Sequence, residues 1–185
     1  MSAQRIKEAV ESLREGGVIA YPTEAVYGLG CDPTNNAAIE RLLSIKQRRW
    51  EKGLILIAAE FQQLQPYLLE VDKSLQEKIL NSWPGPVTWL WPAKATVSKL
   101  LCGTHETIAV RVTNHPLAAA LCREFGAPLV STSANLSGKS PARTADEVRN
   151  QMGENLDYVL EGKIGGSGKP SEIRDALTGE IVREA

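Results

Sequence analysis

Apolar residues recur along the chain at helical spacing in some stretches and in short runs in others, and this alternation predicts an α/β fold. Helical spacing predicts an amphipathic helix over residues 3–15, closed by a pair of glycines. A short apolar run predicts a buried strand over residues 18–21, and Pro22 ends it because proline cannot donate to a central ladder. Residues 23–30 are then expected to form a loop at the carboxyl end of this strand, where ligands collect in open α/β sheets.

The rest of the chain continues this alternation. In chain order, the pattern predicts a helix that runs into Lys46, a strand over 54–59, one or two helices between 64 and 80 with Asp72 as an N-cap, strands over 87–91 and 107–113, a helix over 117–125, a strand over 128–132, a helix that Thr144 caps, strands near 157–160 and 172–177, and a hairpin that ends near Arg183.

The clearest strand covers residues 107–113, where aliphatic side chains occupy one face. Arg111 lies on the opposite face, among small or hydroxylic neighbours such as Thr107. This pattern fits the floor of a polar pocket, and it fits equally an exposed face with a solvated arginine.

Composition indicates one ordinary globular domain over residues 1–185, with 43% hydrophobic and 23% charged residues. A domain of this size buries roughly 70% of the surface of its unfolded chain. The net charge of -1 and the pI near 6.2 exclude a protein that coats nucleic acid by bulk electrostatics, so any such contact would have to be a local patch. Neither a signal core nor an apolar run of 18 residues occurs, and we expect a cytoplasmic protein without a membrane segment.

The cysteines and histidines do not form a recognisable site. Cys31, Cys102 and Cys122 are odd in number and lack CxxC spacing, and the only histidines are His105 and His115. We therefore expect neither a disulfide framework nor a zinc site, and we expect the thiols to be buried small hydrophobes. The histidines fall where a turn or a helix start is the default role.

Positive charge is concentrated locally. Lys46, Arg48, Arg49 and Lys52 fall within seven positions, between a predicted helix and a predicted buried strand. They cannot all point into the core, because an unpaired buried charge costs several kcal/mol or more. The stretch is predicted to line a surface; a concave one could hold a polyanion such as a triphosphate, and the alternative is a solvated loop.

Two glycine-rich segments resemble nucleotide motifs only in part. In residues 165–169, Lys163 stands where a phosphate loop needs its first glycine, and Pro170 stands where it needs Ser or Thr. Residues 28–30 lack the third glycine of a dinucleotide fingerprint, since Pro33 occupies that position. The first segment is therefore predicted to be a flexible loop, either closing over a ligand or acting as a linker.

No Ser, His and acid arrangement signals covalent catalysis. What the chain offers instead is a set of cations and hydroxyls, which suits chemistry done by positioning and by neutralising phosphate charge. The set comprises Thr23, Lys46, Arg48, Lys52, Thr107, Arg111, Ser131, Ser133, Asn135, Ser171 and Arg183.

Four blocks of sequence, in order, resemble the YrdC/TsaC family, whose members are threonylcarbamoyl-AMP synthases of tRNA modification. The blocks are Tyr21-Pro22-Thr23-Glu24-Ala25-Val26-Tyr27-Gly28-Leu29-Gly30, Lys46-Gln47-Arg48 with Lys52-Gly53-Leu54-Ile55, Ala109-Val110-Arg111-Val112 with His115-Pro116, and Ser131-Thr132-Ser133-Ala134-Asn135-Leu136-Ser137-Gly138. The resemblance runs from about residue 6 to residue 183.

The resemblance implies a single α/β domain in which helices flank a twisted, mixed or parallel sheet around a deep electropositive cavity. The family joins L-threonine, bicarbonate and ATP into threonylcarbamoyl-AMP and pyrophosphate, with Mg²⁺ held mainly by the ATP phosphates. A partner complex, the threonylcarbamoyl transferase, then modifies adenosine 37 of tRNAs that read codons beginning with A. Whether tRNA itself weakly contacts the chain is left open.

The resemblance also assigns residues. The tetrad that grips ATP, taken as catalytic, would be Lys46, Arg48, Ser133 and Asn135. The nucleotide side would be completed by Lys52, Thr107, Ser131 and Arg183. Threonine would be held by Thr23, Arg111 and Ser171, with its carboxylate on Arg111. A forked guanidinium on a polar strand face is independently suited to bidentate capture of a carboxylate.

Two other functions are compatible with the same residues. The first is an RNA-binding module whose cavity is a basic docking patch, which the cationic stretch also permits. The second keeps the chemistry and changes the substrate, making carbamoyl-AMP for a metal-centre maturation pathway, as related domains in larger proteins do.

Overall fold

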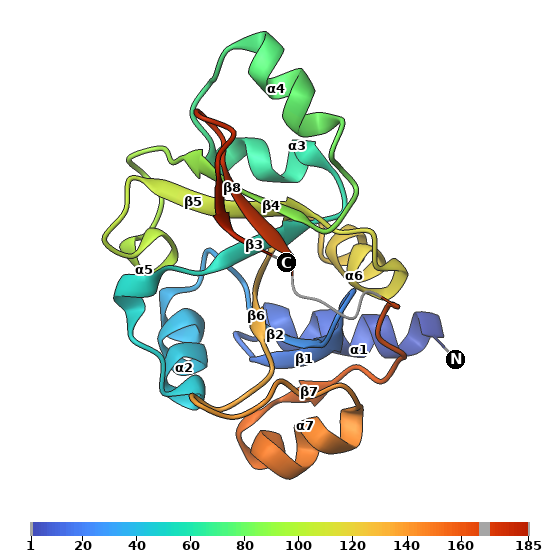
Figure 1. Cartoon of the computed structure of the whole chain (residues 1–185). Helices are drawn as coiled ribbons and strands as arrows, with labels where there is room; N and C mark the ends of the chain where they lie inside the picture. The colour runs from blue at the N-terminus through green and yellow to red at the C-terminus, as the bar shows by residue number, and fades with distance from the viewer. Residues whose placement is uncertain (1, 167–170, 185) are drawn as a thin grey trace.

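The computed structural model describes residues 2–166 and 171–184, and these form one mixed sheet with helices on both faces (Figure 1). Within this described part the sheet has nine strands, in the order β7-β1-β2-β6-β3-β5-β4-β8-β9. Their bounds are β1 Ile19–Pro22, β2 Tyr27–Gly30, β3 Ile55–Ala58, β4 Val87–Pro92, β5 Thr107–Val112, β6 Leu129–Ser133, β7 Tyr158–Val159, β8 Glu172–Asp175 and β9 Ile181–Arg183. Parallel pairs join β1 to β7, β3 to β5 and β4 to β8, and the other neighbours are antiparallel. The predicted α/β class with a mixed sheet is confirmed.

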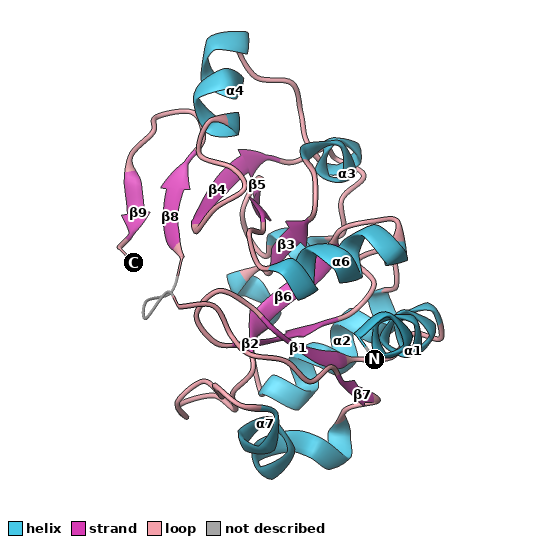
Figure 2. Cartoon of the chain, turned by 90° about the vertical axis from the view of Figure 1, so that its right-hand side faces the viewer, coloured by secondary structure: helices cyan, strands magenta, loops and turns pink. Residues whose placement is uncertain are grey.

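The helices divide between the two faces of the sheet. Their bounds are α1 Ser2–Arg14, α2 Asn36–Lys46, α3 Phe61–Leu64, α4 Lys73–Leu80, α5 Lys99–Cys102, α6 Pro116–Phe125 and α7 Ala145–Met152, with 3-10 turns η1 Trp50–Lys52, η2 Gln65–Tyr67 and η3 Gly153–Asn155. One core cluster joins α1 and α6 to one face of β1, β3 and β6, and a larger cluster fills the opposite face. In Figure 2, α4 and α7 lie at opposite ends of the molecule.

Several local predictions are confirmed. The strand predicted over 87–91 is β4, and its Trp89 and Trp91 both pack in the larger core. Asp72 and Thr144 cap α4 and α7, and the side chain of His115 accepts from the Ala118 amide at the start of α6. The three cysteines are free and buried, as expected. Among the described residues, no helix is both long and apolar enough to cross a membrane.

The predicted loop over residues 23–30 is wrong in its second half. Residues 27–30 form β2, which pairs antiparallel with β1, and the hairpin between them is closed by the amide and hydroxyl of Thr23, both donating to the carbonyl of Val26 at 3.0 and 2.7 Å. The sequence pattern did not predict this strand because two of its four residues, Gly28 and Gly30, are glycines, which have a low strand propensity. In the fold they are needed, since a Cβ on Gly30 would lie 2.3 Å from the carbonyl oxygen of Val130.

Other differences are smaller. The short elements η1 and α5 were not predicted, and β6 continues to Ser133, one residue into the predicted polar loop. Most of the glycine-rich loop predicted over Gly165–Pro170 lies outside the described residues.

Substituting Gly30 by alanine tests the close approach of β2 to β6. The added Cβ meets backbone that cannot move without breaking the sheet, so we expect Gly30→Ala to lower the free energy of unfolding by about 2 kcal/mol or more. Gly166→Ala is the control, because a Cβ there has open space within 4 Å, and it should change stability by less than about 0.5 kcal/mol. Equal urea-denaturation midpoints for the two variants would contradict this account.

Candidate functional site

A cavity of about 490 Å³ opens beside the β1–β2 hairpin, on the sheet face that α1 and α6 cover elsewhere. Segments that are distant in the sequence meet in its walls. Its walls are formed by Thr23, Glu24, Ala25, Val26, Tyr27, Gly28, Arg48, Leu54, Ile55, Pro86, Arg111, Ser131, Thr132, Ser133, Pro141, Ser171 and Arg183.

Strand register explains why a hollow forms here. Ile57 pairs with both Arg111 and Leu129, and Ile57 and Leu129 pack against α6. Two residues earlier on β3, Ile55 lies between Ala109 and Ser131, and no helical residue lines the cavity at that level. The two neighbours of Ile55 on this face are therefore small or hydroxylic, and they leave the volume that a ligand needs.

Gly28 contributes to the same opening. A Cβ at this position would lie 3.2 Å from Cγ2 of Thr23 and 3.4 Å from Oγ of Ser131, both of which line the cavity. Any larger residue would fill the space between two predicted ligand-binding side chains.

Arg111 lies on the floor of the cavity, with only 8% of its surface exposed. The alternative of a solvated arginine on an exposed face is therefore wrong. Its Nη2 lies 3.3 Å from Oε2 of Glu24, which comes from the β1–β2 hairpin. The other Glu24 oxygen accepts from the hydroxyl of Thr113 at 2.7 Å and from the amide of Asn114 at 3.0 Å.

Glu24 is ionised in this environment. Burial acts to raise the pKa of its carboxyl, but the charge of Arg111 and the hydrogen bonds from Thr113 and Asn114 outweigh burial and hold that pKa below its ordinary value. Sequence reasoning did not select Glu24 as a site residue. Its position in the loop after the first buried strand is the signal that could have done so.

Two further arginines give the cavity an excess of positive charge. Arg48 donates to the carbonyl of Gly53 at 3.0 Å, and Arg183 donates to the carbonyl of Ser171 at 2.8 Å. The pKa of Arg48 is lowered by burial and then by the charge of Arg183, and that of Arg183 by burial and then by Arg111. Since Glu24 is the single carboxylate among the described residues of the wall, the cavity suits an anion.

The predicted hydroxyl groups are also brought together. Thr23, Ser131 and Ser171 are buried, and Ser133 is half-buried, all in the cavity wall. Ser171 accepts a hydrogen bond from the hydroxyl of Thr88 at 3.0 Å, which orients it.

Lys46 and Asn135 lie directly behind this wall. Lys46 is only 4% exposed, and its ammonium donates to the carbonyl of Ser133 and to the carbonyl and side-chain oxygen of Asn135, the last two at 3.0 and 3.2 Å. The hydroxyl of Ser133 donates to the same Asn135 oxygen at 2.6 Å. Burial, followed by the charge of Arg48, lowers the pKa of Lys46 to about 8.

Of the four cations predicted to line one concave surface, only Arg48 lines the cavity, and Lys46 lies behind its wall. Arg49 points away with an 80% exposed side chain and pairs with Glu51, and Lys52 is exposed and does not line the cavity. Thr107 is half-buried at the start of β5 and is likewise absent from the wall. The described residues contain no group of three His, Cys, Asp or Glu side chains that could hold a metal ion.

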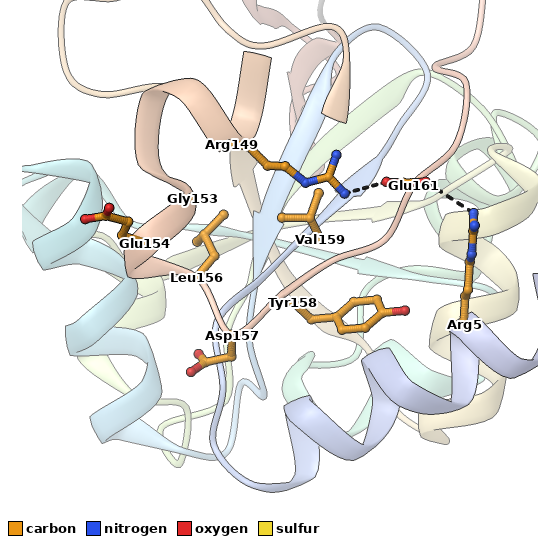
Figure 3. A pocket seen from close by; sticks show the side chains of 9 residues that line it. All are labelled: Arg5, Arg149, Gly153, Glu154, Leu156, Asp157, Tyr158, Val159 and Glu161. Carbon is orange, nitrogen blue, oxygen red and sulfur yellow. Dashed lines mark hydrogen bonds and ion pairs between the residues drawn. The ribbon is translucent and has the colours of Figure 1, made fainter. Parts of the chain in front are cut away.

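A second depression, of about 650 Å³, lies at the β7 edge of the sheet (Figure 3). Its two arginines, Arg5 and Arg149, both pair with Glu161. Because three acidic side chains in the lining, Glu154, Asp157 and Glu161, outnumber these two arginines, the depression offers less to an anion than the cavity does, although it is larger.

Known proteins share both sequence and fold with the chain. A family model described as telomere recombination, for Sua5, YciO and YrdC proteins, matches residues 11–185. A Threonylcarbamoyl-AMP synthase of Photobacterium profundum is 53% identical over 181 residues, which are 97% of this chain and 98% of that protein.

Solved structures agree. The P. abyssi Sua5 complexed with L-threonine is 30% identical, with a TM-score of 0.90 over 96% of this chain and 53% of that one, so the chain spans about half its length. The E. coli YciO crystal structure is 31% identical, with a TM-score of 0.85 over 98% of this chain and 89% of that one.

The depressed pKa of Lys46 predicts a pH dependence of stability. Between its folded pKa of about 8 and its ordinary value of 10.5, the unfolded state binds more protons than the folded state, so this lysine makes the free energy of unfolding rise with pH. In Lys46→Met that contribution disappears, and the rise should be smaller. Urea denaturation of both proteins at several pH values from about 7.5 to 10 measures the difference. Lys52→Met is the matched control with an exposed lysine, and a wild-type slope in Lys46→Met would refute the assignment.

Proposed function

The chain belongs to the Sua5/YciO/YrdC family, and we propose that it is a threonylcarbamoyl-AMP synthase that joins L-threonine, bicarbonate and ATP, with release of pyrophosphate. The observation that carries this proposal is the cavity, in which Arg48, Arg111 and Arg183 meet buried hydroxyl groups. Such a site can hold nucleotide phosphates and an amino-acid carboxylate side by side.

Arg111, Ser171 and Thr23 are proposed to bind threonine. The guanidinium of Arg111 is fixed on the cavity floor, and a carboxylate can accept its remaining donors in a bidentate arrangement. The hydroxyls of Thr23 and Ser171 lie in the same wall and are available for the polar groups of the substrate.

ATP is proposed to occupy the side of the cavity formed by Arg48 and Ser133. Lys46 and Asn135 lie behind Ser133 and would hold its segment in place or, once freed from the carbonyls, reach the phosphates. Ser131 and Arg183 line the same cavity, whereas Lys52 and Thr107 would reach the nucleotide only from outside its wall. Mg²⁺ would enter as MgATP, with the phosphates as its main ligands.

The chemistry needs positioning more than a protein nucleophile. The threonine ammonium first loses a proton to solvent, and the neutral amine attacks carbon dioxide that bicarbonate releases together with hydroxide. The carbamate forms as the nitrogen gives its next proton to that hydroxide, which leaves as water. A carbamate oxygen then attacks the α-phosphorus and pyrophosphate leaves, while the arginines neutralise the phosphate charge. Binding both substrates in one hollow converts these encounters into reactions within one complex.

The product is proposed to pass in the cytoplasm to a threonylcarbamoyl transferase complex that modifies adenosine 37 of tRNA. The alternative of an RNA-docking module is less well supported by the geometry. A docking patch needs exposed cations, whereas the cavity recedes to the buried Arg111.

The proposal predicts threonine-dependent release of pyrophosphate. With MgATP and bicarbonate, L-threonine should release pyrophosphate at least about tenfold faster than L-valine, which lacks the hydroxyl that buried polar groups would bind. Pyrophosphate is followed by a coupled phosphate assay. No release above the rate without an amino acid would refute the proposed function.

Mutations should affect the threonine-binding and the ATP-binding parts of the site separately. Arg111→Ala should lower kcat/KM for threonine by about 100-fold while the Kd of ATP changes less than about threefold, because a charged hydrogen-bond partner of the carboxylate is lost. Lys46→Ala should weaken ATP binding about tenfold or more. Calorimetry with ATP and initial rates against threonine measure both effects.

Arg149→Ala is the matched control, since it removes an arginine from the depression at β7. It should retain the wild-type values. If Arg111→Ala and Lys46→Ala also retained the wild-type kcat/KM for threonine and Kd of ATP, the assignment of these residues would be wrong even if the activity were present.

A further inference from the structure

Two buried polar atoms of opposite character have no hydrogen-bond partner at the floor of the cavity. They are Oε2 of Glu24 and Nε of Arg111, and the side chains that carry them are only 13% and 10% exposed. Buried polar groups in folded proteins are nearly always hydrogen-bonded, so the protein alone leaves this ion pair incompletely satisfied.

The Glu24 carboxylate is held in one orientation. Its Oε1 is fixed by the hydroxyl of Thr113 and the amide of Asn114. The amide of Gly165 donates to the carbonyl of Thr23 at 2.9 Å. Gly165 also packs closely on the backbone of Glu24, since a Cβ on Gly165 would lie 2.8 Å from the carbonyl oxygen of Glu24. Oε2 therefore has its ion pair with Arg111 and one further acceptor position that the protein leaves uncommitted.

Charge decides what this oxygen would bind. An amino acid whose carboxylate lies on Arg111 also brings an ammonium group into a cavity that Arg48 and Arg183 make positive. Among the described residues of the cavity wall, Glu24 carries the one carboxylate, and it lies 3.3 Å from Arg111. The arginines repel the ammonium, and this carboxylate attracts it.

We propose that Glu24 and Arg111 form a clamp for a zwitterionic α-amino acid, in which Arg111 binds the carboxylate and Glu24 receives the ammonium. This rests on the proposed function, which supplies threonine as the ligand. The clamp holds the nitrogen that is carboxylated in the reaction once it has lost a proton, and it makes Glu24 a substrate-binding residue in addition to the ion-pair partner of Arg111.

A comparison of ligands on the wild type tests the clamp without any mutation. The ligands are L-threonine and (3R)-3-hydroxybutanoate, which keeps the carboxylate and the hydroxyl but lacks the amine. A charge-assisted hydrogen bond is worth about 1.5–3 kcal/mol, so calorimetry should find threonine bound about tenfold to 150-fold more tightly. Equal affinities would overturn the inference.

Glu24→Gln distinguishes binding from positioning. If Glu24 receives the ammonium, the variant weakens threonine while 3-hydroxybutanoate changes little, and the preference for threonine drops below about threefold. If Glu24 served only to orient Arg111, both ligands would weaken by the same factor and the preference would persist, which would overturn the inference.

Thr113→Val is the matched control, because it removes a hydrogen bond to the same carboxylate and leaves the charge. In Thr113→Val, the ratio of the affinities for threonine and 3-hydroxybutanoate should stay within about threefold of the wild-type ratio. Absence of threonine binding by the wild type would overturn the proposed function together with this inference, whereas threonine binding with an unchanged preference in Glu24→Gln would overturn the inference alone.

Discussion

The buried pair of Arg111 and Glu24 is the interaction on which the rest of the site depends. A guanidinium buried without a partner costs several kcal/mol, so Arg111 can occupy the cavity floor only while a carboxylate compensates its charge. That carboxylate comes from the β1–β2 hairpin, far away along the chain. The pair thus fixes the hairpin over the central strands, and the hairpin in turn forms one wall of the hollow.

The hollow itself depends on small residues in specific rows of the sheet. Gly28 pairs with Ser133 on β6, and Ile55 lies between Ala109 and Ser131. Where the same face carries Ile57 and other aliphatic side chains, α6 covers it. The boundary between core and cavity is therefore set within two residues of a strand, because successive side chains on one face are two positions apart.

Much of this arrangement follows from the sequence, and the exceptions have physical causes. The alternation in β5 already placed Arg111 opposite an aliphatic face, but alternation alone does not show whether a polar face is solvated. Lys46 was expected at a surface because buried charge is costly. It is buried instead, because carbonyl groups 87 and 89 residues away accept hydrogen bonds from its ammonium. Contacts of that range leave no local pattern, and the ion pair of Glu24 with Arg111 is also such a contact, although the loop position of Glu24 is itself a signal. The nucleotide roles of Lys52 and Thr107 stay predictions.

The described residues also explain why positioning is the chemistry that suits this site. Burial raises the pKa of the Cys31 and Cys122 thiols to about 12 in each case, so neither supplies a thiolate near neutral pH. His115 uses one ring nitrogen to cap α6, and the other lies 3.0 Å from the carbonyl of Lys163. In the part of the chain that the structure describes, the polar side chains that line the cavity carry guanidinium groups, hydroxyl groups and one carboxylate. Such groups bind and orient charged substrates, which is sufficient when the substrates themselves supply both the nucleophile and the leaving group.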